Sequence, residues 1–459
     1  MFNKKNIYLI ISILSTLSLL SASDTSPIYI PIDPLLENAK ESPTLLAKRL
    51  ASERRAQGLE VYDWGLGASP FSVPEEVVQS LRDHAHYRQY GQVNGISELA
   101  EAILNYYKNS NQNFEREGLL VAPGLKQLLY DVQRAYDGEI IHVTPYWVSY
   151  PQQSAILGKY TRVIHTKREN DYKLQANELE ELCRENLTKA RLLIFNHPVN
   201  PTGVAYSTSE LKEIAKVCKR HDIIVVADEV YLACHHQGSY ESISDYLPEQ
   251  TIRMSSLSKE FSAGGWRLGW ALFPKSLYPL KQAMAILGSN SYSLAPVPIQ
   301  YAAATALKGS ESLDLYRKNT QKVLRSVSKM IESRLEKMNL HYATPSAAWY
   351  FFIDFENHRN SLEKKGIFTS QDLVEKLIDD LGIVFVSGEA FGLNPEELCV
   401  RASAIDYDGD ITLAIVEKLA DSEEFDTENV PCLSRIETCL DLLETWLLDE
   451  QQPFIDQLS

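Results

Sequence analysis

The chain has 459 residues, 44% of them hydrophobic and 23% charged, and its 61 acidic and 45 basic residues give a formal net charge of −16. Such a length predicts roughly two or three domains with a large core, and the composition excludes intrinsic disorder, collagen and coiled-coil arrays. The acidic balance argues against nucleic acid and anionic membranes as partners, and six scattered cysteines without a CxxC pair argue against a disulfide framework or a structural zinc site.

The chain begins with a signal-like segment. Lys4 and Lys5 precede an apolar run over residues 7–20, and the small residues Ser21-Ala22-Ser23 follow. A charged start, a short apolar stretch and a small-residue exit are the three parts of a secretory signal peptide. The run is interrupted by serines and is shorter than the roughly 20 apolar residues of a membrane span. We interpret residues 1–34 as a signal-like extension, with an uncleaved anchor or a wrongly chosen start codon as alternatives.

Strand and helix patterns alternate through the middle of the chain. Short apolar runs bounded by turn residues predict strands over residues 139–145, 191–195 and 223–227. Helical spacing and a capping box, Ser207 with Glu210, predict helices over residues 124–138 and from 207 to about 221. Continuous apolar strands that alternate with helices predict an α/β fold with a mostly parallel sheet, in which ligands bind beyond the carboxyl ends of the strands.

Polar motifs follow the ends of these strands. They are Asn200-Pro-Thr-Gly203, Asp228-Glu-Val-Tyr231, Ser256-Leu-Ser-Lys259 and Gly265-Trp-Arg267. Because the carboxyl ends of parallel strands share one edge, we expect a lysine, an aspartate, a tyrosine, an asparagine and an arginine to meet there. Pyridoxal phosphate needs that set: an amine for its aldehyde, a carboxylate for its ring nitrogen, and arginine and amides for its phosphate.

With these motifs the chain resembles a fold-type I pyridoxal-phosphate enzyme, a class I aminotransferase of the aspartate/prephenate aminotransferase group. The resemblance runs from about Leu45 to Ser403 and also rests on Tyr90-Gly-Gln-Val-Asn-Gly95-Ile-Ser-Glu-Leu99, Pro145-Tyr-Trp-Val-Ser-Tyr-Pro151 and Arg401-Ala-Ser403. It implies a large domain with a mostly parallel, seven-stranded sheet flanked by helices, and a smaller α+β domain. The expected boundaries are residues 35–72 and 330–459 for the small domain and residues 73–329 for the large, cofactor-binding domain.

The end of the small domain is expected to form an acidic helical tail. Residues 421–459 contain eleven acidic residues and one basic residue, a net charge of −10. Apolar residues recur at helical spacing at Ile436, Leu440, Leu443 and Leu447. This stripe predicts an amphipathic terminal helix that packs on the body of the protein.

The resemblance implies a role for each motif residue on the cofactor. Lys259 would hold the cofactor as an internal aldimine and afterwards move the substrate Cα proton. Asp228 would keep the ring nitrogen protonated, and Tyr231 and Asn200 would hydrogen-bond the phenolic oxygen. Trp147 would stack on the ring. Groups expected at the phosphate are Arg267, Ser256, Ser258, the amides of Leu125 and Lys126, and Tyr90 of the other subunit, which implies a homodimer with shared sites.

The resemblance also implies a substrate side of the site. The expected residues are Gly67, Trp147, Asn200 and Arg401, with Arg401 binding the α-carboxylate in a bidentate fork. The chain departs from the family pattern at Gly67-Ala-Ser-Pro-Phe71, where Gly-Glu-Pro-Asp-Phe is usual, and at Leu125, which replaces a small residue. The adjacent His235 and His236 lack further spaced ligands, so no metal site is expected.

The reaction predicted from this resemblance is transamination: an L-amino acid (aspartate, glutamate or aromatic) gives its amino group to a 2-oxo acid such as 2-oxoglutarate, in a ping-pong scheme. Alternatives are a β-lyase, a decarboxylase, an aminocyclopropane-carboxylate-synthase-like enzyme, or a non-catalytic binding protein of the same fold. No second cation for a distal carboxylate can be placed from the sequence, since residues 288–292 contain neither Arg nor Lys. We expect a cytoplasmic enzyme, with export as the alternative if residues 1–34 act as a signal.

Overall fold

The computed structural model describes residues 30–37, 42–185, 190–420, 423–428 and 430–448, and the chain divides into two units, residues 1–39 and 40–459. The described part of the first unit contains one short helix, α2 (Pro34–Glu37). The predicted signal-like run at residues 7–20 lies outside the described residues. Within the described ranges, no helix is both long enough and apolar enough to cross a membrane.

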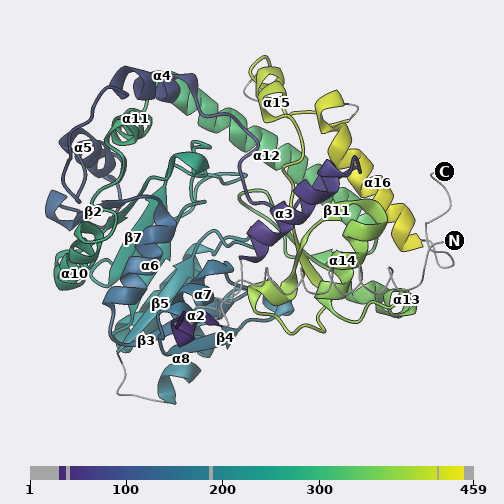
Figure 1. Ribbon diagram of the computed structural model, residues 1–459, viewed down its shortest axis with the longest axis horizontal. Coiled ribbons are helices and arrows are strands. Elements are labelled where there is room, and N and C mark those ends of the chain that lie inside the picture. The colour runs from purple at the N-terminus through teal and green to yellow at the C-terminus, as the bar shows by residue number, and fades with distance from the viewer. Residues whose placement is uncertain (1–29, 38–41, 186–189, 421–422, 429, 449–459) are drawn as a thin grey trace, which may run out of the picture. The chain divides into compact units, whose positions relative to one another are not determined.

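A seven-stranded sheet with the order β2-β8-β7-β6-β5-β3-β4 forms the larger part of the second unit (Figure 1). Its strands are β2 (Leu119–Ala122), β3 (Glu139–Thr144), β4 (Thr161–His165), β5 (Arg191–Asn196), β6 (Ile224–Asp228), β7 (Thr251–Ser256) and β8 (Gly269–Leu272). The strands from β4 to β7 are parallel, whereas β8 runs antiparallel to β7 and β2. The predicted α/β fold with a mostly parallel sheet is confirmed, and β3, β5 and β6 form where the apolar runs predict them.

Alternate strand residues face opposite layers of helices, as the two-residue period of a strand requires. Ile140 and Leu192 pack in one core with α6 (Leu125–Ala135). Their neighbours Ile141 and Leu193 pack in another core with α8 (Ala176–Arg184) and α9 (Thr208–Arg220). The predicted capping box starts α9, because the Ser207 hydroxyl accepts a hydrogen bond from the Glu210 amide. Burial on both faces explains why these strands are apolar throughout.

A second, smaller sheet lies beyond the long helix α12 (Glu311–Lys337), on the right of Figure 1. It is antiparallel, with the order β12-β13-β10-β9, formed by β9 (His341–Tyr342), β10 (Tyr350–Asp354), β12 (Val386–Ser387) and β13 (Cys399–Ser403). A two-stranded pair joins β1 (Tyr62–Asp63) to β11 (Ile383–Val384) in parallel. Residues before the large sheet therefore pair with residues after it, although the predicted domain boundaries stay predictions.

The other helices surround the two sheets. They are α3 (Pro43–Ala56), α4 (Glu75–His84), α5 (Ser97–Tyr106), α7 (Ser149–Ile156), α10 (Tyr278–Ser289), α11 (Val297–Lys308), α13 (Arg359–Lys364), α14 (Ser370–Leu381), α15 (Gly409–Val416) and α16 (Ser434–Leu448). Helix α16 confirms the predicted terminal helix, since Ile436, Leu440, Leu443 and Leu447 are all buried. Residues 449–459 of the acidic tail lie outside the described ranges.

Candidate functional site

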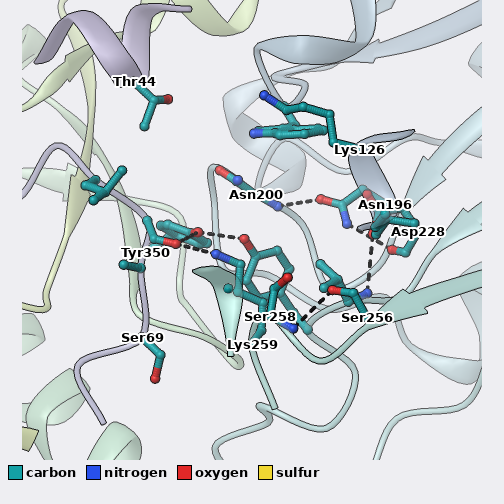
Figure 2. A pocket seen from close by; sticks show the side chains of 18 of the residues that line it. Thr44, Ser69, Lys126, Asn196, Asn200, Asp228, Ser256, Ser258, Lys259 and Tyr350 are labelled. Carbon is teal, nitrogen blue, oxygen red and sulfur yellow. Dashed lines mark hydrogen bonds between the residues drawn. The ribbon is translucent and has the colours of Figure 1, made fainter. Parts of the chain in front are cut away.

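A cavity of about 600 Å³ lies where β5, β6 and β7 end. Asn196, Asp228 and Ser256, the last residues of these three strands, line it. Residues from α3 and β13 line it as well, so the cavity lies between the large sheet and the smaller one. Figure 2 shows side chains from both sides pointing into this space. Its position is the one expected for a ligand site in a parallel sheet.

Almost all of the predicted site residues line this one cavity. They are Gly67, Leu125, Lys126, Trp147, Asn200, Asp228, Tyr231, Ser256, Ser258, Lys259, Arg267 and Arg401. Tyr90 does not line it, and its side chain is 90% exposed. A role for Tyr90 in the site of a second subunit therefore stays a prediction.

Lys259 places its amine in the centre of the cavity. It follows β7 on a turn, and its Nζ donates a hydrogen bond to the carbonyl of Gly67. The amine also lies 5.6 Å from the ring centre of Tyr231 and 5.5 Å from that of Trp349. Lys259 also lines the cavity, so its amine is placed where a ligand aldehyde could react with it.

Asp228 is a buried carboxylate at the end of β6. One of its oxygens, Oδ2, accepts a hydrogen bond of 2.5 Å from the Tyr150 hydroxyl, and Oδ1 accepts one of 3.3 Å from the Val230 amide. Burial raises the pKa of Asp228 to about 6, and the Tyr150 hydrogen bond opposes this shift. Asp228 forms no ion pair within the described part of the chain. A buried carboxylate without a cation is costly, so a cationic ring nitrogen fits this position.

Arg401 is a buried cation on β13, on the opposite side of the cavity. Its side chain is 1% exposed, and its Nη1 donates to Asn200 Oδ1 at 3.2 Å. Nη2 donates to the Gly65 carbonyl, whereas Nε has no hydrogen-bond partner among the described residues. The rings of Tyr350 and Phe391 lie 5.1 and 5.2 Å from its guanidinium carbon. Burial lowers the pKa of Arg401, and a carboxylate ligand would supply the missing anion.

Hydrogen-bond donors gather at the start of α6. Arg267 lies against Gly124, the residue before the helix, where any Cβ would collide with the guanidinium. Gly124 also has a φ of +91°, which disfavours other residues. Leu125 and Lys126, the first residues of the helix, line the cavity together with Ser256 and Ser258. A helix start beside an arginine and hydroxyl groups has the donors that a phosphate group requires.

Lys126 adds a further cation to the cavity, next to Trp147. Its Nζ lies 5.0 Å from the centre of the Trp147 ring. Partial desolvation lowers the pKa of Lys126, and the nearby Arg267 lowers it further. Its Nζ has no hydrogen-bond or ion-pair partner in the ranges that the structure describes. Sequence reasoning used the amide of Lys126 and missed its side chain.

Four other residues of the cavity were missed from the sequence. Asn196 accepts a 2.7 Å hydrogen bond from the Asn200 amide and holds that loop against β6. Tyr150 contacts Asp228, and the hydroxyls of Tyr350 and Tyr231 are 2.6 Å apart. Thr44 Oγ1 is buried without a hydrogen-bond partner among the described residues. The sequence around Thr44, Tyr150 and Tyr350 is that of a helix start or an apolar run, so it does not mark them as site residues. Asn196 follows a predicted strand directly and could have been predicted.

Comparison with known proteins identifies the family of this chain. Residues 60–408 match the model of the family "Aminotransferase class I and II". The chain belongs to this family. It is 31% identical to the aspartate aminotransferase of Bacillus subtilis over 78% of this chain and 90% of the relative. It is also 31% identical to a probable aspartate/prephenate aminotransferase of Rickettsia bellii, over 79% of this chain and 92% of the relative.

A solved structure agrees with the fold of this aminotransferase. The aspartate aminotransferase from Thermus thermophilus superposes with a TM-score of 0.76 at 25% identity, over 84% of this chain and 98% of that one. The cofactor of the enzyme is therefore pyridoxal 5′-phosphate. The cavity fits this group: the Lys259 amine, the unpaired Asp228 carboxylate and the donors at the start of α6 match its aldehyde, ring nitrogen and phosphate.

Proposed function

We propose that this aminotransferase acts on dicarboxylic substrates, with L-aspartate or L-glutamate as amino donor and a 2-oxo acid such as 2-oxoglutarate as acceptor. The observation that carries the proposal is the pair of cations in the cavity, Arg401 and Lys126, neither of which has a carboxylate partner in the described ranges. Lys259 and Arg267 are assigned to the cofactor, so these two cations remain for the substrate and favour a ligand with two carboxylates.

The relatives support a dicarboxylic substrate. Those quoted above are named for aspartate or for aspartate and prephenate, and each of these compounds carries two carboxylates. The similar Thermus thermophilus enzyme was solved with maleate, a four-carbon dicarboxylate. Prephenate is accordingly a further candidate acceptor for this chain, and its bulk would extend toward Thr44, which Figure 2 shows across the cavity from Lys126.

Within this proposal each side chain has one task. When bound, pyridoxal phosphate supplies an aldehyde that takes up and releases the amino group and a ring that withdraws electrons from the substrate Cα. Lys259 binds the aldehyde and moves the proton at Cα. Asp228 keeps the ring nitrogen protonated, and Trp147 stacks on the ring. Tyr231 and Asn200 hydrogen-bond the phenolic oxygen.

The remaining residues bind the phosphate of the cofactor and the two carboxylates of the substrate. At the phosphate we place Arg267, Ser256, Ser258 and the amides of Leu125 and Lys126. Arg401, with Asn200 beside it, binds the α-carboxylate, and the backbone at Gly67, which also lines the cavity, assists it. Lys126 Nζ binds the distal carboxylate. We further propose a homodimer in which the exposed Tyr90 reaches the phosphate of the other subunit.

Lys126→Met is expected to reduce kcat/KM for L-aspartate by about 10- to 100-fold, since a charged hydrogen bond contributes about 1.5–3 kcal/mol. Methionine keeps most of the length of the side chain and all of the backbone amide, so phosphate binding should persist. For L-phenylalanine, which has no distal carboxylate, kcat/KM should stay within about threefold, because no such bond is lost. Steady-state kinetics with both donors tests this, with Lys126→Arg as the charge-retaining control. An equal loss for both donors would contradict the proposal.

Asp228→Asn is expected to stabilise the cofactor-free protein, and by more at pH 8 than at pH 5. The folded-state pKa of about 6 lies above the ordinary 3.8, so wild-type stability falls as the pH rises from about 4 to 6. This difference corresponds to a cost of about 3 kcal/mol at pH 8 and about half of that at pH 5. Asparagine can still accept the Tyr150 hydrogen bond.

Urea unfolding of both cofactor-free proteins at the two pH values measures this effect. The advantage of the variant should grow by about 1.5 kcal/mol from pH 5 to pH 8. Added pyridoxal phosphate should reverse the order, because the wild-type carboxylate then gains a cationic partner. A stability difference that is the same at both pH values would show that the Asp228 carboxyl does not have the raised pKa described above.

A further inference from the structure

The hydroxyl of Tyr350 lies among three of the groups assigned above. Tyr350 begins β10 and is 1% exposed, and its Oη is 2.6 Å from Tyr231 Oη. It is 3.4 Å from the Gly67 carbonyl, to which Lys259 Nζ also donates. Gly67 must lack a side chain here, because a Cβ would collide with this hydroxyl. Figure 2 shows Tyr350 and Lys259 close to each other, and its dashed lines mark hydrogen bonds of this group of residues.

The geometry limits where the single Tyr350 proton can go. The 2.6 Å contact with Tyr231 is a short hydrogen bond, whereas 3.4 Å to the Gly67 carbonyl is near the outer limit. That carbonyl already accepts from the Lys259 amine. Tyr231 is a buried phenol whose pKa is raised well above its ordinary value, chiefly by desolvation, so it keeps its own proton. If Tyr350 donates to Tyr231, the Tyr231 proton is free for a third acceptor.

We propose that Tyr350 is a positioning residue that acts through Tyr231: by donating to the Tyr231 oxygen, it directs the Tyr231 proton toward the phenolic oxygen of bound pyridoxal phosphate. The inference rests on the proposed function, which places Tyr231 at that oxygen. Two hydroxyls in series polarise each other, so Tyr231 becomes a stronger donor than it would be alone. The other ionisable groups around this pair are Lys259, Asp228 and Arg401.

The ring of Tyr350 has a separate contact, since it lies 5.1 Å from the Arg401 guanidinium. Tyr350→Phe removes the hydroxyl and leaves this ring in place. The variant therefore separates the effect on Tyr231 from any effect on carboxylate binding. It also changes the buried packing by one atom, and a thermal unfolding midpoint within a few degrees of wild type confirms that the fold is kept.

The test is a pH titration of the visible absorption of the protein-bound cofactor, without substrate, in wild type, Tyr350→Phe, Tyr231→Phe and the double variant. A hydrogen bond to the phenolate favours the less protonated form of the cofactor. Losing the Tyr350 hydroxyl should raise the titration midpoint by about 0.5–1 pH unit. Tyr231→Phe should raise it by more, and the double variant should match Tyr231→Phe, because Tyr350 acts through Tyr231.

Binding of maleate, measured by its effect on the same absorption, completes the test. The maleate dissociation constant of Tyr350→Phe should equal that of wild type at a pH where both are in the same protonation state. If the titration midpoint of Tyr350→Phe equals that of wild type while that of Tyr231→Phe is shifted, the role of Tyr350 is overturned and the role of Tyr231 stands. Additive shifts in the double variant would overturn the route through Tyr231. Absence of visible absorption in wild type would overturn the proposed cofactor contacts as well.

Discussion

Lys259→Ala should abolish transamination while the protein stays folded. The amine binds the cofactor aldehyde and moves the Cα proton in the account given above, and general acid–base catalysis alone contributes about 10²–10⁴-fold. Loss of both tasks should lower kcat for L-aspartate and 2-oxoglutarate by more than about 10⁴-fold. The measurement is formation of oxaloacetate and glutamate by the purified variant with saturating pyridoxal phosphate.

Lys126→Ala is the matched control for this variant, because it removes a lysine from the same cavity that has a different task. It should retain turnover of L-phenylalanine, whereas Lys259→Ala should lose turnover of every donor. Circular dichroism and the thermal midpoint verify that both variants fold. Turnover by Lys259→Ala within about tenfold of wild type would show that Lys259 is not a catalytic residue.

Arg401→Ala should raise KM for every α-amino acid and 2-oxo acid. Arg401 is the buried cation without a carboxylate partner in the described part of the chain, and truncating one side of a buried charge pair costs about 2–5 kcal/mol. The expected loss in kcat/KM is roughly 30- to 5000-fold, similar for L-aspartate and L-phenylalanine, since both present the same α-carboxylate.

Arg401→Lys separates charge from shape. Lysine keeps the positive charge but not the planar fork of donors, so its kcat/KM should fall between those of Arg401→Ala and wild type. The cofactor-free Arg401→Ala protein should unfold at a urea concentration close to that of wild type, because removing the costly buried charge offsets the hydrogen bonds and packing that are lost with the side chain. A loss confined to one donor would contradict a general carboxylate clamp and would instead favour a role in side-chain selection.

Much of this site could be predicted because its residues follow strand ends. Asp228 ends a strand whose apolar run predicts a parallel sheet, and Ser256 ends the neighbouring strand, so their meeting in one cavity follows from topology. The spacing from Ser256 to Lys259 then places the amine at the same edge. These residues required no knowledge of how side chains pack.

The missed residues depend on packing that no local pattern contains. The sequence predicts that α6 starts near Gly124, but the direction of the Lys126 side chain follows from its packing on Trp147, which lies 21 positions later. Tyr350 begins a strand of buried aromatic residues and reads as ordinary core. Its contact with Tyr231 joins the small sheet to the large one, a pairing of residues 119 positions apart. Such contacts depend on how the two sheets pack against each other, which the local sequence does not reveal.

The central claim is tested most directly by an absorption spectrum of the purified protein loaded with pyridoxal phosphate, before and after addition of L-aspartate without any 2-oxo acid. We expect the visible band to be replaced by the near-ultraviolet band of the aminated cofactor. Oxaloacetate should form in an amount equal to that of the aminated cofactor, and 2-oxoglutarate should restore the visible band. L-phenylalanine should need a higher concentration for the same change. A visible band that no dicarboxylic amino acid alters, or release of ammonia or carbon dioxide in place of oxaloacetate, would contradict the account.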